Sequence, residues 1–328
     1  MMRRRDFITF VGVAAAAWPL AARAQRGALP VIGYLSSSSA AGSQPQLTAL
    51  RNGLKEAGFA EGGNLRVEYR WAENRYDRLP ALAADLVQRR VAAIVASGAV
   101  NSPLAAKAAT RTIPIVFVTG SDPVDIGLVA SLGRPGGNLT GVTLISRELF
   151  AKRLELLHDL IPNIRVIGLL VNPSNPNAKS EIAELQPLAT AGGWRLLVVA
   201  AGTEADIDTA FATLAQQKAD AFTIGTDAFF TNRRSQITAL ATRYAVPGIY
   251  SARENVDAGG LMSYGSSVSE AWRQVGLYVA RILKGDKPGD LPIMRPTKFE
   301  LVINLTAAKV IGLKIPETFL ARADEVIE

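Results

Sequence analysis

The chain has 328 residues, of which 48% are apolar and 20% charged, a soluble composition that argues against extensive disorder. One hydrophobic core rarely serves a chain of this length, so we expect two packed units. The net charge is +7, but basic and acidic residues are interleaved, which argues against a nucleic-acid-binding surface. Because the chain has no cysteine, it can form no disulfide bond and carry no lipid on a cysteine.

Residues 1–24 predict a secretory signal peptide. A basic start precedes an apolar stretch at 7–20, and the segment ends in a small-x-small sequence, so we expect cleavage near Ala24 and a periplasmic location. The pair Arg4-Arg5 resembles a twin-arginine export signal, although the residue before it is not the usual Ser or Thr. Both that route and the general secretory route therefore stay open. No later stretch has the ~20 apolar residues of a membrane span.

The first half of the mature chain alternates short apolar runs with segments of helical periodicity. Strands are expected at 31–36, 65–73, 92–97, 114–119 and 138–144. Helices are expected at 46–58, 78–90 and 102–110. Strands that alternate with helices predict a parallel sheet covered by helices on both faces.

The same order of elements begins again near the middle of the chain. The run VIGYL at 31–35 is matched by VIGLL at 166–170, and each leads into a loop of small polar residues. Strands are expected at 166–171, 194–200, 221–225, 247–251 and 260–265. Helices are expected at 148–162, 178–193, 204–218 and 233–245. We therefore predict an α/β protein with two doubly wound, Rossmann-like lobes.

A helix at 268–285 and a strand at 298–305 follow after the second lobe is complete. These two additional elements predict a chain that crosses back between the lobes, with crossings near 141–146, 265–267 and 287–298. We expect lobe 1 to contain residues 25–143 and 267–290, and lobe 2 to contain residues 144–266 and 296–328. Three parallel connections form a hinge on which two lobes can close around a ligand.

Three long blocks, at 114–143, 227–265 and 296–328, resemble the ABC-transporter substrate-binding proteins of the tryptophan- and aromatic-amino-acid-binding type. The resemblance covers the whole mature chain. It implies the type I periplasmic-binding fold and delivery of a small organic solute, such as an aromatic amino acid or related acid, to a permease in the inner membrane. We expect a monomer with no nucleic-acid partner. A sensory ligand-binding domain that feeds a signalling partner is the alternative.

In open α/β sheets, ligands bind beyond the carboxyl ends of the strands, so the loops there supply the candidate site. Hydroxyl and amide groups of these loops could hold a carboxylate at a helix start, and Asn101 could also cap its helix. Asp122 precedes a proline and is equally typical of a turn. The candidates in lobe 1 are Ser36, Ser37, Gly98, Asn101, Thr119 and Asp122.

Lobe 2 offers an aromatic wall with a few polar anchors, as small-molecule pockets usually do. The resemblance implies that Asp227 corresponds to the acid that faces the amine of the ligand, although this residue is also placed to cap the next helix. Of the adjacent Phe229 and Phe230, we expect one to face the cleft and the other the core. The candidates in lobe 2 are Asn172, Asp227, Phe229, Tyr250 and Tyr264.

The sequence does not favour an enzyme. The single histidine, His158, follows two leucines and is interpreted as a partly buried helix residue rather than a catalytic base. With His158 interpreted as a helix residue and no cysteine in the chain, we expect no histidine-based triad and no zinc site of the usual histidine and cysteine ligands. The motifs G-x-S-x-G, Walker A and G-x-G-x-x-G are absent. We therefore expect no cofactor and no metal.

Overall fold

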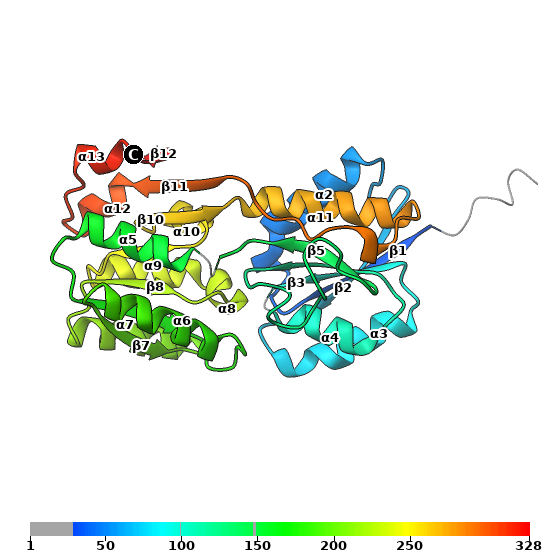
Figure 1. Ribbon diagram of the computed structural model, residues 1–328, viewed down its shortest axis with the longest axis horizontal. Helices are drawn as coiled ribbons and strands as arrows, with labels where there is room; N and C mark the ends of the chain where they lie inside the picture. Colours follow the sequence, from blue (N-terminus) through cyan, green and yellow to red (C-terminus); the bar gives the residue numbers. More distant parts are fainter. Residues whose placement is uncertain (1–28, 99, 147–148) are drawn as a thin grey trace, which may run out of the picture.

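The computed structural model describes residues 29–98, 100–146 and 149–328, so the predicted signal peptide lies outside the described residues. Two α/β lobes lie side by side along the long axis of the molecule (Figure 1). Each lobe is built on one sheet with helices on its faces, which confirms the predicted fold class.

Lobe 1 contains a fully parallel five-stranded sheet with the order β2-β1-β3-β4-β5. Its strands are β1 (Val31–Ser36), β2 (Arg66–Trp71), β3 (Ala93–Ser97), β4 (Ile115–Thr119) and β5 (Leu139–Thr143). Its helices are α2 (Gln44–Glu56), α3 (Leu79–Gln88), α4 (Asn101–Ala109) and α11 (Val268–Leu283). The short 3-10 turns are η1 (Ala41–Ser43), η2 (Tyr76–Arg78) and η3 (Pro288–Asp290).

Lobe 2 contains a seven-stranded sheet with the order β12-β11-β10-β9-β8-β6-β7. Its strands are β6 (Val166–Val171), β7 (Arg195–Ala200), β8 (Ala221–Ile224), β9 (Gly248–Tyr250), β10 (Met262–Ser266), β11 (Phe299–Asn304) and β12 (Glu325–Ile327). Its longer helices are α5 (Phe150–Leu160), α6 (Ala178–Ala191), α7 (Glu204–Gln216) and α9 (Arg234–Arg243). Its short helices are α8 (Ala228–Asn232), α10 (Arg253–Asp257), α12 (Leu305–Val310) and α13 (Glu317–Leu320).

The repeated sequence at the start of each lobe has a structural counterpart. Strands β6 to β10 are wound in the same order as β1 to β5, with the first strand of each lobe second from the edge. The third residue of each first strand is glycine, Gly33 in β1 and Gly168 in β6. A methyl group at Gly33 would collide with Leu86 of α3, and one at Gly168 with Leu214 of α7. The two glycines thus let a helix leucine pack directly on the first strand of each lobe.

The expectation of purely parallel sheets is wrong for one strand. Strand β11 runs antiparallel to β10, with Ser263 opposite Val302. The chain leaves lobe 2 after β10, forms α11 in lobe 1 and returns, so it enters the lobe 2 sheet in the opposite direction. Two neighbouring parallel strands are joined by a crossover connection that returns to the starting edge of the same sheet. The connection from β10 to β11 instead passes through lobe 1, so it does not impose a parallel direction on β11.

The chain passes between the lobes after β5, after β10 and before β11, as the predicted hinge requires (Figure 1). The crossing segments lie next to one another. The Thr143 amide donates to the Met294 carbonyl at 2.9 Å, and the Ser266 hydroxyl donates to the Leu144 carbonyl at 3.2 Å. These bonds tie the crossing segments together where the chain passes between the lobes.

Helix α11 is fixed to lobe 1 by unusually close packing on α2. Gly276 of α11 faces the backbone of Leu50 and Leu54, and Gly53 of α2 faces the backbone of Arg273. A methyl group at either glycine would collide with the backbone of the opposite helix. The pair of glycines therefore sets how closely the helix that follows the second crossing docks on lobe 1.

Candidate functional site

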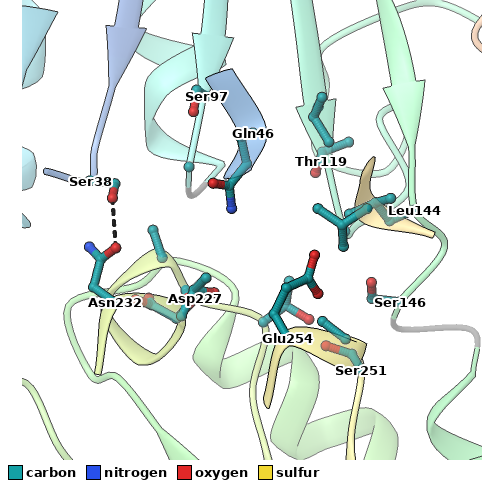
Figure 2. Close-up of a pocket in the computed structure, with 18 of the residues that line it drawn as sticks. Ser38, Gln46, Ser97, Thr119, Leu144, Ser146, Asp227, Asn232, Ser251 and Glu254 are labelled. Atoms are coloured by element: carbon teal, nitrogen blue, oxygen red, sulfur yellow. Dashed lines mark hydrogen bonds between the residues drawn. The ribbon is translucent and has the colours of Figure 1, made fainter. Parts of the chain in front are cut away.

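A cavity of about 140 Å³ lies between the two lobes, where the carboxyl ends of their strands face each other. Lobe 1 contributes residues at the ends of β3 and β4, including Ser97 and Thr119, and Gln46 from α2. Lobe 2 contributes residues that follow β8 and β9, including Asp227 and Glu254. Figure 2 shows these side chains around one common space. The site is therefore the interlobe cleft that the strand order predicts.

The lining combines apolar and polar groups. Val118, Leu144, Ile224 and Trp272 supply apolar surface, and Trp272 is 3% exposed. Serine, threonine and asparagine side chains supply most of the polar groups. A mixed lining of this kind suits a small ligand with an apolar body and a polar end.

Three polar atoms of lining residues have no hydrogen-bond partner among the described residues. One is a donor, Nδ2 of Asn255, and the other two are acceptors. The acceptors are Oε1 of Gln46, from lobe 1, and Oε2 of Glu254, from lobe 2, and both are buried. Burial raises the pKa of Glu254 above that of an ordinary glutamate. Buried polar atoms are usually paired, so unpaired ones that line a cavity mark positions where a ligand can supply the partner.

Hydrogen bonds across the cleft hold the lobes together. The Ser38 hydroxyl donates to Asn232 Oδ1 at 2.8 Å, and Asn232 Nδ2 donates to Asn74 Oδ1 at 2.8 Å. Asn177 Nδ2 donates to the Ser121 hydroxyl at 2.8 Å. Figure 2 shows the Ser38–Asn232 bond at one side of the cavity. The structure therefore has the two lobes in direct polar contact.

Asp227 is the centre of a buried hydrogen-bond network between the lobes. Its Oδ1 accepts from the Tyr76 hydroxyl at 2.8 Å and from the Phe229 amide at 2.7 Å. Its Oδ2 accepts from Asn172 Nδ2 at 3.2 Å and Asn175 Nδ2 at 2.6 Å. Burial raises the pKa of Asp227, while the surrounding donors oppose that rise. The bond from the Phe229 amide is the helix cap of α8, one of the two roles expected for this residue.

Three of the predicted site residues, Gly98, Thr119 and Asp227, line the cavity. Gly98 has a φ of +93°, and a side chain there would collide with the Ser37 side chain, so only glycine allows this close approach. Thr119 uses its hydroxyl to accept the Ser121 amide at 3.1 Å.

The other candidates of lobe 1 lie near the cavity but do not line it. Ser36 is fully buried and its hydroxyl accepts the Ser38 amide at 3.1 Å, while Ser37 is buried beside Ser97. Asn101 makes no capping hydrogen bond, because Val100 occupies the N-cap of α4. Asp122 accepts the amides of the two residues at 124 and 125, so it acts as a turn former.

The remaining candidates of lobe 2 are also outside the lining. Asn172 supports Asp227, and its own Oδ1 accepts the Ser174 amide at 3.0 Å. Phe229 packs in the core of lobe 2 together with Phe230 and Tyr250. The expectation that one of the two phenylalanines faces the cleft is therefore wrong, because neither lines the cavity. Tyr264 packs against Phe299 in a second core cluster, 6.3 Å between ring centroids.

The sequence reasoning missed Gln46, Glu254 and Trp272. Glu254 could have been found by the rule used for the other loops, because it follows β9 at its carboxyl end. Gln46 lies in the first turn of α2, which follows β1 and the serine-rich loop. Trp272 belongs to α11, and only the crossing of the chain back to lobe 1 brings it to the cleft.

The structure supports no metal centre in the part of the chain that it describes. No group of three or more histidine, cysteine, aspartate or glutamate residues within the described ranges could hold a metal ion. His158 is exposed rather than partly buried, with its ring 5.5 Å from the ring of Trp194. Among the helices of the described residues, none is long and apolar enough to span a membrane.

Comparison with known proteins agrees with this geometry. A family model described as ABC transporter substrate binding protein matches residues 39–327. A tyrosine-binding protein of Clostridioides difficile (strain R20291) is 27% identical over 264 residues, which cover 80% of this chain and 74% of that protein.

Two solved structures have the same arrangement over nearly the whole chain. A conserved domain protein from Vibrio cholerae is 30% identical with a TM-score of 0.83, covering 91% of this chain and 100% of that chain. An ABC domain from Streptococcus pneumonia in complex with L-Trp is 25% identical with a TM-score of 0.81, covering 92% and 100%. The chain belongs to the ABC transporter substrate-binding protein family and is the solute-binding component of an ABC importer.

Proposed function

We propose that the solute bound by this protein is an aromatic amino acid. The observation that carries the proposal is the interlobe cavity, in which apolar residues such as Leu144 and Trp272 lie together with unpaired polar atoms of Gln46 and Glu254. Its volume of about 140 Å³ is close to that of an engineered cavity of roughly 150 Å³ that binds benzene. A single aromatic ring therefore suits the apolar part of the space.

The relatives support the same class of ligand. One is named for binding tyrosine, and another was solved with L-Trp. Because both ligands combine an aromatic ring with a zwitterionic end, they fit a lining of mixed polarity.

We place the protein in the periplasm as a monomer that delivers its solute to a permease in the inner membrane. The predicted signal peptide at 1–24 and the family support export. Closure of the lobes on the hinge would present the loaded form to the permease. We infer that the ligand is released unchanged, since delivery of a solute to a permease requires no chemistry on it.

A thermal-shift screen of the mature chain tests this proposal. The panel contains aromatic amino acids, aliphatic amino acids, aromatic acids without an amine, sugars and nucleosides. A ligand present at 100 times its dissociation constant stabilises the fold by about 2.7 kcal/mol, which is a clear shift in melting temperature. Stabilisation by tyrosine or tryptophan is expected, and a shift only with sugars or nucleosides would reject the ligand class.

A further inference from the structure

Glu254 is a largely buried acid that forms no ion pair among the described residues, although the charges of Arg234 and Arg253 lower its pKa from a distance. It lies in α10 of lobe 2, and its Oε2 has no hydrogen-bond partner among the described residues. No described lysine, arginine or histidine forms an ion pair with it within 4.0 Å. Figure 2 shows its carboxylate pointing into the cavity. An unpaired buried carboxylate is costly, so a ligand that pairs with it gains a strong interaction.

Asp227, the other acid of the cavity, has no acceptor site left for a ligand. An ionised carboxylate offers about four lone-pair sites. Tyr76 and the Phe229 amide occupy two of these at Oδ1, and Asn172 and Asn175 occupy two at Oδ2. A ligand amine could bond to Asp227 only by displacing one of these donors. Glu254 requires no such displacement.

A second acceptor lies on the opposite side of the cavity. Oε1 of Gln46 is also buried without a partner among the described residues, and Figure 2 shows the Gln46 side chain reaching from lobe 1 toward the space that Glu254 enters from lobe 2. An ammonium group has three N–H donors and no acceptor. One ammonium group therefore has enough donors for an acceptor from each lobe.

We propose that Glu254 binds the cationic amine of the ligand and makes the cavity selective for amino acids over the corresponding acids that lack an amine. This inference rests on the proposed function, because it specifies which end of the solute is recognised and by which residue. Glu254 thus takes the role that the sequence analysis gave to Asp227, and Asp227 serves as a contact between the lobes.

The experiment uses isothermal titration calorimetry on the mature chain with two pairs of probes. Each pair is an amino acid and its desamino analogue: L-tyrosine with 3-(4-hydroxyphenyl)propionate, and L-tryptophan with indole-3-propionate. The variants are Glu254→Gln, Glu254→Asp and the control Glu155→Gln, which changes an exposed glutamate of α5 that pairs with Lys152. The wild type is expected to bind the amino acid of a pair more tightly than its analogue.

Glu254→Gln is expected to weaken the amino acid about tenfold or more, since it removes a charge-assisted hydrogen bond, and to leave the analogue unchanged or tighter. Glu254→Asp should retain part of the selectivity, which keeps the test decisive if the glutamine variant folds poorly. Glu155→Gln should match the wild type with every probe.

Two results would overturn the inference and leave the receptor role intact. They are wild-type amino-acid affinity in Glu254→Gln, and a wild type that binds the desamino analogues better than the amino acids. A wild type that binds none of the four probes would overturn the inference together with the proposed ligand class.

Discussion

The Tyr76 hydroxyl of lobe 1 donates a 2.8 Å hydrogen bond to the Asp227 carboxylate of lobe 2. Tyr76 and Asp227 are 151 positions apart in the chain, and they face each other from opposite sides of the cleft. Burial and the charge of Asp227 both raise the pKa of Tyr76, so its hydroxyl keeps its proton and remains a donor. The bond is therefore a charge-assisted contact between the two lobes.

We expect Tyr76→Phe to shift the protein toward an open arrangement of the lobes. A hydrogen bond to a charged group contributes about 1.5–3 kcal/mol, so ligand affinity should fall by about tenfold or more if closure depends on it. Small-angle scattering at saturating ligand should show a larger radius than the wild type. Tyr69→Phe is the matched control, because the Tyr69 hydroxyl donates to the Glu61 carboxylate at 2.9 Å within lobe 1. Equal radii and affinities for the two variants would contradict the prediction.

Glu254→Gln should stabilise the protein without ligand at neutral pH. Burial raises the pKa of Glu254, Asp257 raises it further, and Arg234 and Arg253 oppose the rise. Folding that raises the pKa of a carboxyl group favours its neutral form. The protein therefore has its full stability at a pH below the pKa of the group in the unfolded chain, and it loses stability as the pH rises through the pKa of the group in the folded protein. The variant has no such loss, so its melting temperature should exceed that of the wild type at pH 7.5.

The difference in melting temperature should shrink as the pH falls toward 4.5, the ordinary pKa of a glutamate, because Glu254 of the wild type then becomes neutral. Thermal unfolding of both proteins from pH 4.5 to pH 8 checks this, with Glu155→Gln as an exposed control. A difference that stays constant over the whole range would mean that the charge of Glu254 carries no cost in the fold.

The sequence was sufficient to predict the two lobes because the apolar periodicity of buried strands is a local property. VIGYL and VIGLL both form buried interior strands, and the extra helix at 268–285 correctly indicated a chain that returns to lobe 1. The direction of β11 was not predictable by the same reasoning, since it depends on the path through the other lobe.

The site was harder to predict than the fold. The rule that ligands lie beyond the carboxyl ends of strands identified Gly98, Thr119 and Asp227 in the lining, because each ends a strand or lies within three residues of its end. The same rule also selected Tyr250 and Tyr264, whose rings face the core. Side chains alternate between the two faces of a sheet, and periodicity does not tell which face of a strand end meets the cleft.

Gly276→Ala should weaken the docking of α11 on lobe 1. The added methyl group would collide with backbone atoms at Leu50, Leu54 and Gly53, and backbone cannot move aside as a flexible side chain can. Overpacking of this kind typically costs about 1–3 kcal/mol in the free energy of unfolding. Urea unfolding measures the loss, and Gly133→Ala is the control, because an added Cβ at Gly133 meets no atom within 4 Å.

Arg153→Ala should destabilise the region around the hinge. Arg153 is fully buried, donates from Nε to the Tyr264 carbonyl at 3.1 Å and from Nη2 to the Ser146 carbonyl, and so joins residues near two crossings. Burial lowers its pKa to about 10, so it stays protonated at neutral pH.

Each of the two hydrogen bonds from the charged Arg153 side chain contributes about 1.5–3 kcal/mol, so the alanine variant should lose at least about 3 kcal/mol in the free energy of unfolding. Arg153→Met fills most of the space and removes a buried charge, so its loss should be smaller. Arg195→Ala, on the exposed edge strand β7, should stay within about 0.5 kcal/mol of the wild type in the same urea titration. A loss of less than about 0.5 kcal/mol for Arg153→Ala would contradict the prediction, because the hydrogen bonds of the guanidinium would then not stabilise the crossing segments.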